Sequence, residues 1–297
     1  MQSNSLLIIG SRRFKKSTVR MLLEEAQAVF DRALFVPVNK IRIISENGIN
    51  KLFYKGRELS GFNVCYPRVS SKDFFFAQAV IGALENSGAY IPVSLRGFIV
   101  SNHKYYTIKV LSDASVPIVK SSLFISPETG KQSIKEFGLP VVVKTLGGFA
   151  GKGVVLVDSE KQFESILDTV QLFQEVISAQ KFVEGKNSDI RCYVIGEKVI
   201  AVRRTGKQGE WRANISRGGS AIEIEATKEM LGIAKKAARA MKLDICAIDL
   251  IETKKGLAVI EVNFMPGPFK KFLGNRIAKE IIAFLHKKAT EQPITNS

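Results

Sequence analysis

The 297-residue sequence is poor in cysteine and histidine, and it has no long apolar run. Its three cysteines, Cys65, Cys192 and Cys246, lie far apart, which argues against a disulfide framework and for a reducing compartment. With two histidines and no cysteine pair, a zinc site is disfavoured. No segment reaches the roughly 18 apolar residues of a membrane span, and the first residues lack a basic leader. We therefore expect a cytoplasmic protein that does not enter a membrane.

Acidic residues are also comparatively few. The sequence contains 28 Asp and Glu against 44 Lys and Arg, a formal net charge of +16. A field of this sign favours anionic partners such as nucleotides, acidic peptides or nucleic acid. The excess is diffuse, although Ser11 to Arg20 contains five basic residues and no acidic one. A solvated basic face and a dedicated anion site both remain open.

The order of strand-like and helix-like patterns predicts an α/β (α+β) fold in three parts. Residues 1–98 alternate apolar strands with amphipathic helices, which indicates a parallel α/β unit. Residues 99–182 predict a small lid, with a helix before Pro117, two strands around a glycine-rich loop, and a helix whose capping box pairs Ser159 with Gln162. Residues 183–297 are mostly strand-like, with one helix capped by Thr227 and a final helix.

The most specific local pattern is the stretch "CAIDLIETKKGLAVIEVNF", residues 246–264. The segment "ETKKG" predicts a turn, so the flanking runs form a hairpin in which Asp249 lies roughly opposite Glu261. Regular alternation places Glu261 and Asn263 on one face together with Leu257 and Val259. A buried carboxylate pair repels itself unless a cation neutralises it, and hard oxygen donors suit Mg²⁺. We therefore predict a magnesium site; the alternative, exposed acids on an edge hairpin, is disfavoured because the flanking runs are so apolar.

A second pattern is the glycine-rich loop in "LPVVVKTLGGFAGKGVVLVD", residues 139–158, which has four glycines and two lysines. It is not a Walker A sequence, since no Gly-Lys-Ser/Thr follows, and a plain hairpin turn explains the loop taken alone. Backbone N–H groups in such a loop can also approach phosphate closely. Together with Lys104, Lys144 and a metal site, the loop becomes a candidate phosphate flap.

A third pattern is "GEWRANISRGGS", residues 209–220, in which Trp211, Arg212, Asn214 and Arg217 lie beside a glycine pair. An ordinary surface loop explains this composition. The two arginines and the asparagine could instead hold a carboxylate or a phosphate in bidentate geometry.

Six separated motifs, in this order and spacing, resemble the ATP-grasp superfamily, specifically its RimK-like branch of amino-acid ligases. They are Lys104, Lys144, "GGFAGKGV", "QKFVEG…DIR", "WRANISRGG" and "AIDL…EVNFMPG". The resemblance covers nearly the whole chain. It implies an ATP-grasp fold with an N-terminal pre-grasp domain (1–98), a central lid domain (99–182) and a mostly antiparallel C-terminal domain that carries the metal site (183–297).

The resemblance also implies roles for individual residues. The residues implied in ATP binding are Lys104 and Lys144 for the phosphates, Gly148, Ala150, Gly151 and Gly153 in the flap, Gln180, Lys181, Phe182 and Val183 beside adenine, Asp189 at the ribose, and Arg212 and Asn214 at the phosphate end. The implied ligands of Mg²⁺, with Mn²⁺ as an alternative, are Asp249, Glu261 and Asn263. The implied catalytic residues are Arg217, which faces the reacting carboxylate, and Asn214.

Enzymes of this kind phosphorylate a carboxylate with ATP, and an amine then attacks the acyl phosphate to form an amide, ADP and phosphate. The resemblance therefore implies an ATP-dependent carbon–nitrogen ligase that adds an amino acid, glutamate before others, to an acidic protein or small-molecule acceptor. Homo-oligomerisation stays open. Metal, Lys and Arg suit this chemistry because they neutralise spreading phosphate charge.

Two positions depart from the family pattern. Lys181 stands where the family often has an acid, and Met265 stands where it more often has a small residue. The second position is beside the substrate, so the acceptor is not transferred by resemblance. A hypothesis of another class is a nucleotide-dependent scaffold that uses its basic surface on RNA or the ribosome. The metal trio and the missing aromatic-basic RNA signature disfavour it.

Overall fold

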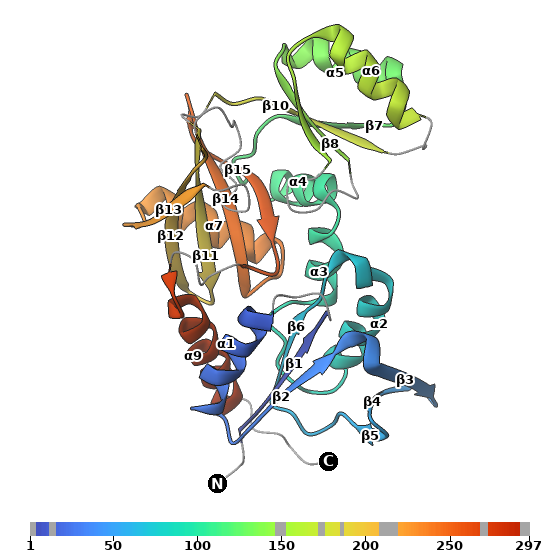
Figure 1. The fold of residues 1–297 in the computed structure, drawn as a ribbon, viewed down its shortest axis with the longest axis vertical. Helices are drawn as coiled ribbons and strands as arrows, with labels where there is room; N and C mark the ends of the chain where they lie inside the picture. Colours follow the sequence, from blue (N-terminus) through green and yellow to red (C-terminus); the bar gives the residue numbers. More distant parts are fainter. Residues whose placement is uncertain are drawn as a thin grey trace.

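The computed structural model describes residues 4–11, 16–145, 153–171, 176–184, 187–207, 219–267 and 273–291. These residues form a mixed α/β fold that is elongated along one axis. A small sheet with two helices lies at one end, a parallel sheet lies at the other end, and a large antiparallel sheet lies between them (Figure 1). This arrangement agrees with the predicted fold class.

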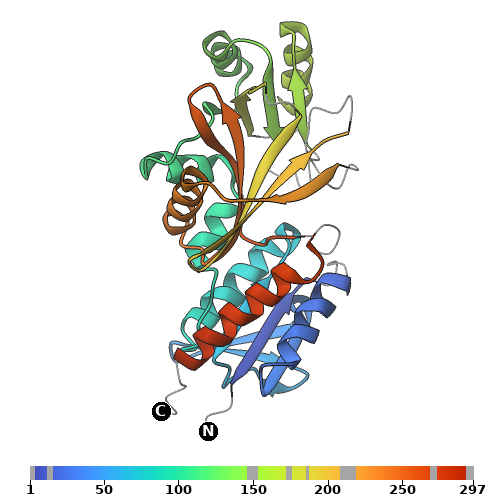
Figure 2. The same ribbon diagram turned by 90° about the vertical axis from the view of Figure 1, so that its left-hand side faces the viewer.

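The N-terminal sheet is parallel, as predicted. Its order is β2-β1-β6, with β1 (Ser5–Gly10) between β2 (Arg32–Pro37) and β6 (Val64–Arg68). Every residue of β1 is buried, as its apolar sequence demands. The helices of this region are α1 (Lys16–Gln27), α2 (Phe74–Glu85) and α3 (Leu95–Ser101), with short 3-10 turns η1 (Val38–Lys40) and η2 (Ser71–Asp73). The last helix of the chain, α9 (Arg276–Glu291), returns to lie beside α1 (Figure 2).

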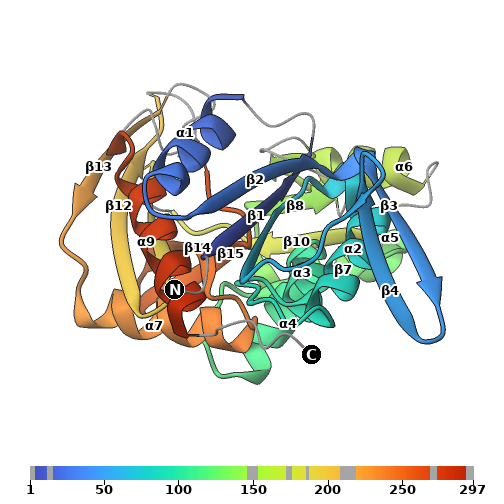
Figure 3. The same ribbon diagram turned by 90° about the horizontal axis from the view of Figure 1, so that it is seen from below.

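A small antiparallel sheet in the N-terminal region was not predicted. It consists of β3 (Ile41–Glu46), β4 (Ile49–Tyr54) and β5 (Arg57–Glu58), and Figure 3 shows it projecting from the rest of the molecule. Most of its residues are exposed or half-buried. The sequence does contain a signal for this hairpin that we missed: Asn47 and Gly48 form the two-residue turn between β3 and β4, with φ values of 51° and 78°, as an Asn-Gly hairpin turn requires.

The lid is an antiparallel sheet of order β7-β10-β8-β9 with two helices. Its elements are β7 (Ser121–Phe124), α5 (Pro127–Phe137), β8 (Val141–Thr145), β9 (Val154–Val157), α6 (Glu160–Gln171) and β10 (Ile177–Lys181). The predicted N-cap is confirmed, since Ser159 Oγ accepts from Gln162 N at 3.4 Å. The return bond differs from the predicted capping box, because Gln162 Oε1 accepts from Asp158 N at 3.1 Å, one residue before the cap.

The C-terminal sheet is antiparallel, with the order β13-β12-β11-β14-β15. Its elements are β11 (Ser188–Ile195), β12 (Lys198–Thr205), β13 (Ser220–Ile224), α7 (Lys228–Ala240), β14 (Ile245–Thr253) and β15 (Gly256–Asn263). Thr227 caps α7 as predicted, through a bond from Met230 N. Strand β13 was not predicted. Helix α4 (Lys104–Asp113) connects α3 to the lid.

Three hydrophobic clusters hold these parts together. Two of them combine residues of the N-terminal sheet with residues of the C-terminal sheet, for example Leu7 with Val259 and Leu6 with Ile245. The third lies wholly within the lid, between Phe124 and Ala179. The domain boundaries at 98 and 182 stay predictions. Within the described ranges, no helix is long and apolar enough to cross a membrane.

Candidate active site

The hairpin of β14 and β15 brings two carboxylates together. Asp249 and Glu261 are direct partners across the two strands, which is the predicted register. A β-bulge follows, because the next pair is Leu250 with Val259, and Ile260 is left as the extra residue. Because of this extra residue, the side chains of β15 before the bulge point to the opposite faces from those that a regular strand would give them.

This bulge corrects one prediction. We expected Leu257 and Val259 on the face of Glu261, but both lie on the opposite face, with Leu250, in the cluster that includes α7. The extra residue allows β15 to bury Val259 on one side and to present Glu261 beside Asp249 on the other. A regular strand could not do both at these positions.

The position of β15 corrects a second prediction. We expected its apolar sequence to exclude an edge position, yet β15 lies at the edge of the sheet. The segment before β7 covers that edge. Val259 N donates to Pro117 O at 2.8 Å, and Val119 N donates to Val259 O at 3.4 Å. The edge is thereby protected, so apolar side chains are tolerated there.

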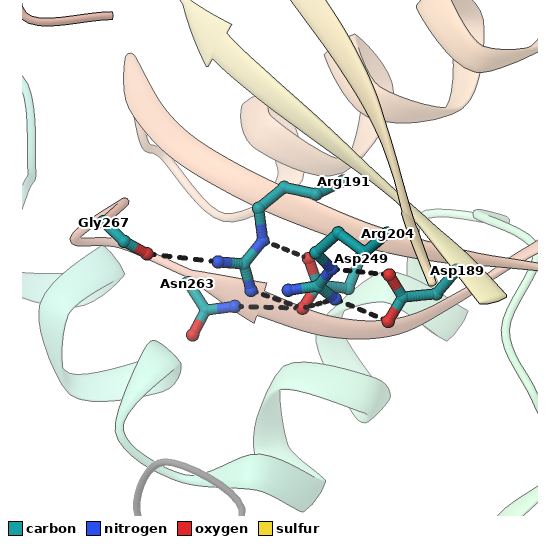
Figure 4. Close-up of polar contacts among 6 residues, drawn as sticks. All are labelled: Asp189, Arg191, Arg204, Asp249, Asn263 and Gly267. Atoms are coloured by element: carbon teal, nitrogen blue, oxygen red, sulfur yellow. Dashed lines mark hydrogen bonds and ion pairs between the residues drawn. The ribbon is translucent and has the colours of Figure 1, made fainter. Parts of the chain in front are cut away.

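Asp249 is the centre of a buried network of charges (Figure 4). Its side chain is 4% exposed, and Arg191 donates to both of its oxygens, from Nε to Oδ1 and from Nη2 to Oδ2, at 2.7 Å each. Arg204 Nη2 lies 3.1 Å from Oδ2. Arg204 also binds both oxygens of Asp189 at 2.5 Å. Two buried carboxylates are thus matched by two buried guanidinium groups.

The pairing of Asp249 with two arginines removes the need for a metal cation to neutralise it. We inferred that the buried carboxylates need a metal cation, but Arg191 and Arg204 already neutralise Asp249, and Glu261 is exposed. Burial alone would raise the pKa of Asp249, but the two arginines outweigh burial and hold that pKa below its ordinary value. The metal assignment therefore rests on the kind of ligand atoms present.

Those ligand atoms do fit a hard cation. Two carboxylates and one amide, from Asp249, Glu261 and Asn263, meet on neighbouring strands, and Asn263 Nδ2 lies 3.5 Å from Asp249 Oδ2. Oxygen donors of this type, few in number and open to water on one side, suit Mg²⁺. Within the described residues, no group of three or more His, Cys, Asp or Glu side chains could hold a metal ion, so the amide of Asn263 is needed as the third ligand here.

Two lysines face these acids. Lys104 is the first residue of α4, and Lys144 lies on β8, where its Nζ donates to Gln180 Oε1 at 2.8 Å. Burial lowers the pKa of Lys144 to about 8, while Glu261 opposes the shift and Lys104 adds to it. Burial also lowers the pKa of Lys104, again opposed by Glu261. The lid, α4 and the C-terminal sheet therefore contribute charged groups to one shared space.

The predicted adenine strand lies beside Lys144. Gln180 and Lys181 end β10, and Phe182 and Val183 follow it. Gln180 Nε2 donates to Ser121 Oγ at 3.1 Å, so both ends of its amide are fixed. Lys181 is exposed.

Only part of the predicted loops is described. Gly153 has a φ of 71°, a value that favours glycine, and its carbonyl accepts from Thr145 N at 2.9 Å. The other residues of the two loops lie outside the described ranges: Gly148, Ala150, Gly151, Arg212, Asn214 and Arg217.

Two site residues, Arg191 and Arg204, and one structural arginine, Arg68, were missed by sequence reasoning. Arg191 and Arg204 interrupt the apolar strands "DIRCYVIG" and "KVIAVRR", and a buried strand seldom includes an arginine without a partner. The sequence therefore contained a signal for both arginines, namely a charged residue within an apolar strand. Arg68 ends β6, where it donates to the Tyr66 hydroxyl at 2.7 Å and to Pro266 O at 3.0 Å. It ties the N-terminal sheet to the segment that follows β15.

Comparisons with known proteins agree with this geometry. A RimK-like ATP-grasp domain model matches residues 101–285. The chain is 32% identical over 288 residues to a probable alpha-L-glutamate ligase of Hydrogenovibrio crunogenus, covering 95% of this chain and 96% of that protein. It is 34% identical over 253 residues to a probable alpha-L-glutamate ligase of Legionella pneumophila strain Corby, covering 83% of each.

Solved structures show the same fold. The ATP-grasp ligase PsnB, complexed with a phosphomimetic variant of its minimal precursor, Mg and ADP, superposes with a TM-score of 0.76 at 20% identity, over 97% of this chain and 100% of that one. A RimK domain ATP-grasp protein from Sphaerobacter thermophilus gives 0.70 at 18% identity, over 94% and 99%.

A lid sheet above an antiparallel sheet, with lysines facing carboxylates between them, defines an ATP-grasp enzyme. The family match and the identity along nearly the full length show that the chain belongs to the RimK-like ATP-grasp family. The prediction of an ATP-dependent ligase is thereby confirmed.

Proposed function

We propose that the protein activates a carboxylate with ATP and joins it to the amine of an amino acid, with glutamate as that amino acid. The observation that carries this proposal is that Lys104 and Lys144 both interact electrostatically with Glu261, which lies opposite Asp249 and on the strand of Asn263. Cations and hard oxygen donors around one space suit phosphoryl transfer to a carboxylate. The relatives named alpha-L-glutamate ligases favour glutamate.

The lysines would hold the phosphates of ATP. Lys144 Nζ is hydrogen-bonded to Gln180 at 2.8 Å, so its side chain is already ordered and loses little conformational entropy when the phosphates bind. Its pKa of about 8 leaves it mostly charged at neutral pH, and a phosphate beside it would raise that pKa again. Adenine would lie against Gln180, Lys181, Phe182 and Val183.

Mg²⁺ would be held by Asp249, Glu261 and Asn263, with Mn²⁺ as an alternative. When bound, the cation would neutralise charge on the phosphates and on the acyl phosphate. Asp189 would bind the ribose. Since Arg204 occupies each of its oxygens once, Asp189 would accept the ribose hydroxyl with a remaining lone pair.

The residues outside the described ranges keep their predicted roles in this proposal. Gly148, Ala150, Gly151 and the described Gly153 belong to the flap, Arg212 and Asn214 to the phosphate end of ATP, and Arg217 to the reacting carboxylate. A guanidinium suits that last role, because its planar fork can hold a carboxylate and the oxyanion that forms from it.

The acceptor in this proposal is an acidic peptide or protein, with an acidic small molecule as the other candidate. The net charge of +16 supports an acidic partner. Solved relatives of the same fold, such as PsnB, are complexed with a precursor peptide, which supports a peptide over a small molecule. Homo-oligomerisation is compatible with either acceptor.

The test is a screen of ADP release with single amino acids, with and without acidic peptides, in the absence of nucleic acid. We expect release that requires glutamate, and a peptide product heavier by whole glutamate residues in mass spectrometry. ADP release that does not depend on an amino acid, or that requires RNA, would contradict the proposal. A Glu261→Gln variant serves as the inactive control.

A further inference from the structure

The guanidinium group of Arg191 is held at all three of its nitrogen atoms. Nε and Nη2 donate to the two oxygens of Asp249 at 2.7 Å, and Nη1 donates to Gly267 O at 3.3 Å (Figure 4). The side chain of Arg191 is 12% exposed and that of Asp249 is 4% exposed. Such a bidentate, buried pair has a fixed geometry, and separating its members would leave an unpaired buried charge.

The pair uses much of the capacity of Asp249 to accept ligands. A carboxylate offers about four lone-pair positions. Arg191 takes one on each oxygen, and Arg204 lies 3.1 Å from Oδ2. Oδ2 is therefore crowded with donors, and a divalent cation would have to approach Oδ1 or compete with an arginine.

The buried charges of this network balance without a metal. Asp189 and Asp249 contribute two negative charges, and Arg191 and Arg204 contribute two positive ones. The remaining candidate ligands are the exposed Glu261 and the uncharged Asn263. Glu261 also interacts electrostatically with two further cations, Lys104 and Lys144. The local field thus offers little net attraction for a free divalent cation.

We propose that Arg191 is a built-in counter-ion of Asp249, which keeps the candidate metal site from holding a divalent cation until nucleotide phosphates add negative charge. This inference rests on the proposed role of Asp249, Glu261 and Asn263 as metal ligands. The metal then enters together with the nucleotide. By linkage, each increases the affinity for the other. Arg191 is a positioning residue here, because it acts through Asp249.

The experiment measures Mn²⁺ binding from the free-ion signal in electron paramagnetic resonance, with and without a non-hydrolysable ATP analogue. Wild type should bind Mn²⁺ weakly alone and tightly with the analogue. Arg191→Met removes the charge but keeps the length, so it should bind Mn²⁺ alone at least about tenfold more tightly than wild type. Arg191→Lys retains the charge and should restore weak binding.

Arg203→Met is the matched control. Arg203 neighbours Arg204 on β12, lies on the other face, and pairs with the exposed Glu252 at 3.0 Å. Its loss should leave Mn²⁺ binding unchanged. If Arg191→Met does not fold, as judged by circular dichroism, Arg191→Gln takes its place, since glutamine can donate to Asp249 without charge.

The outcomes separate this inference from the proposed function. Tight binding of Mn²⁺ alone by wild type, or unchanged affinity in the uncharged variants, overturns the role of Arg191 and leaves the metal site standing. Absence of Mn²⁺ binding even with the analogue overturns the metal site itself, and this inference with it.

Discussion

Asp249 and Glu261 face each other across the hairpin, but their surroundings differ. Asp249 is buried and bound by Arg191, whereas Glu261 is exposed and acts electrostatically on Lys104 and Lys144. Removing the charge of Asp249 would leave a buried guanidinium without its partner and would destabilise the fold. A loss of activity in such a variant would therefore not be separable from a loss of stability. Glu261 can be changed without that cost, so it is the better residue with which to test the site.

We expect Glu261→Gln to lower ADP formation at least about a hundredfold, since it removes a charged ligand from the proposed metal site. Its thermal midpoint should stay within about 2 °C of wild type, because exposed substitutions change stability little. Initial rates of ADP release and a thermal melt provide the two measurements. Glu252→Gln is the matched control: the residue is also exposed, lies on the same hairpin, and binds Arg203. Undiminished ADP formation by Glu261→Gln would remove Glu261 from the site.

Lys144 should make nucleotide binding depend on pH. Its pKa of about 8 lies below the ordinary 10.5 because of burial. Between these values the folded protein has lost a proton that the unfolded chain retains, so the contribution of this group to stability rises with pH across that window. Phosphates placed beside Lys144 should return its pKa upward, and the protein should take up a proton on binding nucleotide at about pH 8.5.

Calorimetry of the ATP analogue in two buffers with different ionisation enthalpies measures this uptake. At about pH 6.5 the uptake from Lys144 should vanish, because the lysine is already charged. Lys144→Arg stays charged throughout and should show no uptake at the higher pH. Equal uptake by this variant and by wild type would assign the proton to another group.

At the scale of the strand and helix, the sequence predicted the elements whose signals are local. The hairpin, its Asp249–Glu261 register and the two caps at Ser159 and Thr227 follow from turn residues and alternation within a few positions. The bulge at Ile260 has no such signal, because one extra apolar residue reads as a continued strand. Strands β3, β4, β5 and β13 were missed although two local signals were present: the Asn47–Gly48 turn between β3 and β4, and the alternation of Ile222, Glu223 and Ile224 in β13.

The residues of the candidate site also divide into those that the sequence predicted and those that only the sheet order reveals. Its metal trio follows from one hairpin, and Lys104 and Lys144 follow from the family resemblance. The arginine network needed the pairing of β11 with both β12 and β14, which sets Arg191 beside Asp249 and Asp189 beside Arg204. Contacts between distant strands are set by the sheet order, and one sequence does not contain that order.

The turn of the metal hairpin provides a stability prediction. Gly256 has a φ of 105°, and a Cβ there would lie 2.7 Å from Glu229 Oε1, which accepts from Leu257 N at 2.9 Å. We expect Gly256→Ala to lower the free energy of unfolding by about 1–3 kcal/mol, through backbone strain and displacement of Glu229. Gly232 in α7 has nothing within 4 Å of a Cβ, so Gly232→Ala should raise stability by about 0.5–1 kcal/mol. Urea unfolding of both variants checks the opposite signs; destabilisation by both would contradict this explanation.

At the scale of the whole molecule, the hydrophobic clusters join the N-terminal and C-terminal sheets and leave the lid apart. Backbone contacts reinforce the junction. Asp244 N donates to Pro92 O at 2.8 Å, and Ser94 Oγ donates to Lys242 O at 3.1 Å. We therefore expect the two sheets to unfold as one cooperative body, while the lid, with its own cluster, responds separately.

Gly97 tests this cooperativity. It lies on α3, where a Cβ would come within 2.7 Å of Met241 O and 2.9 Å of Lys242 O. Backbone atoms cannot move aside cheaply, so Gly97→Ala should lower the free energy of unfolding by about 1–3 kcal/mol. Because the body is shared, amide exchange should speed up in both β1 and β14 and stay unchanged in β8. Gly82→Ala is the control: it is also a helical glycine, its Cβ would meet only Leu95 Cδ2, at 3.4 Å, and exchange should not speed up in any of the three strands. Faster exchange in β1 without a matching change in β14 would show that the two sheets are separate folding units despite their common core.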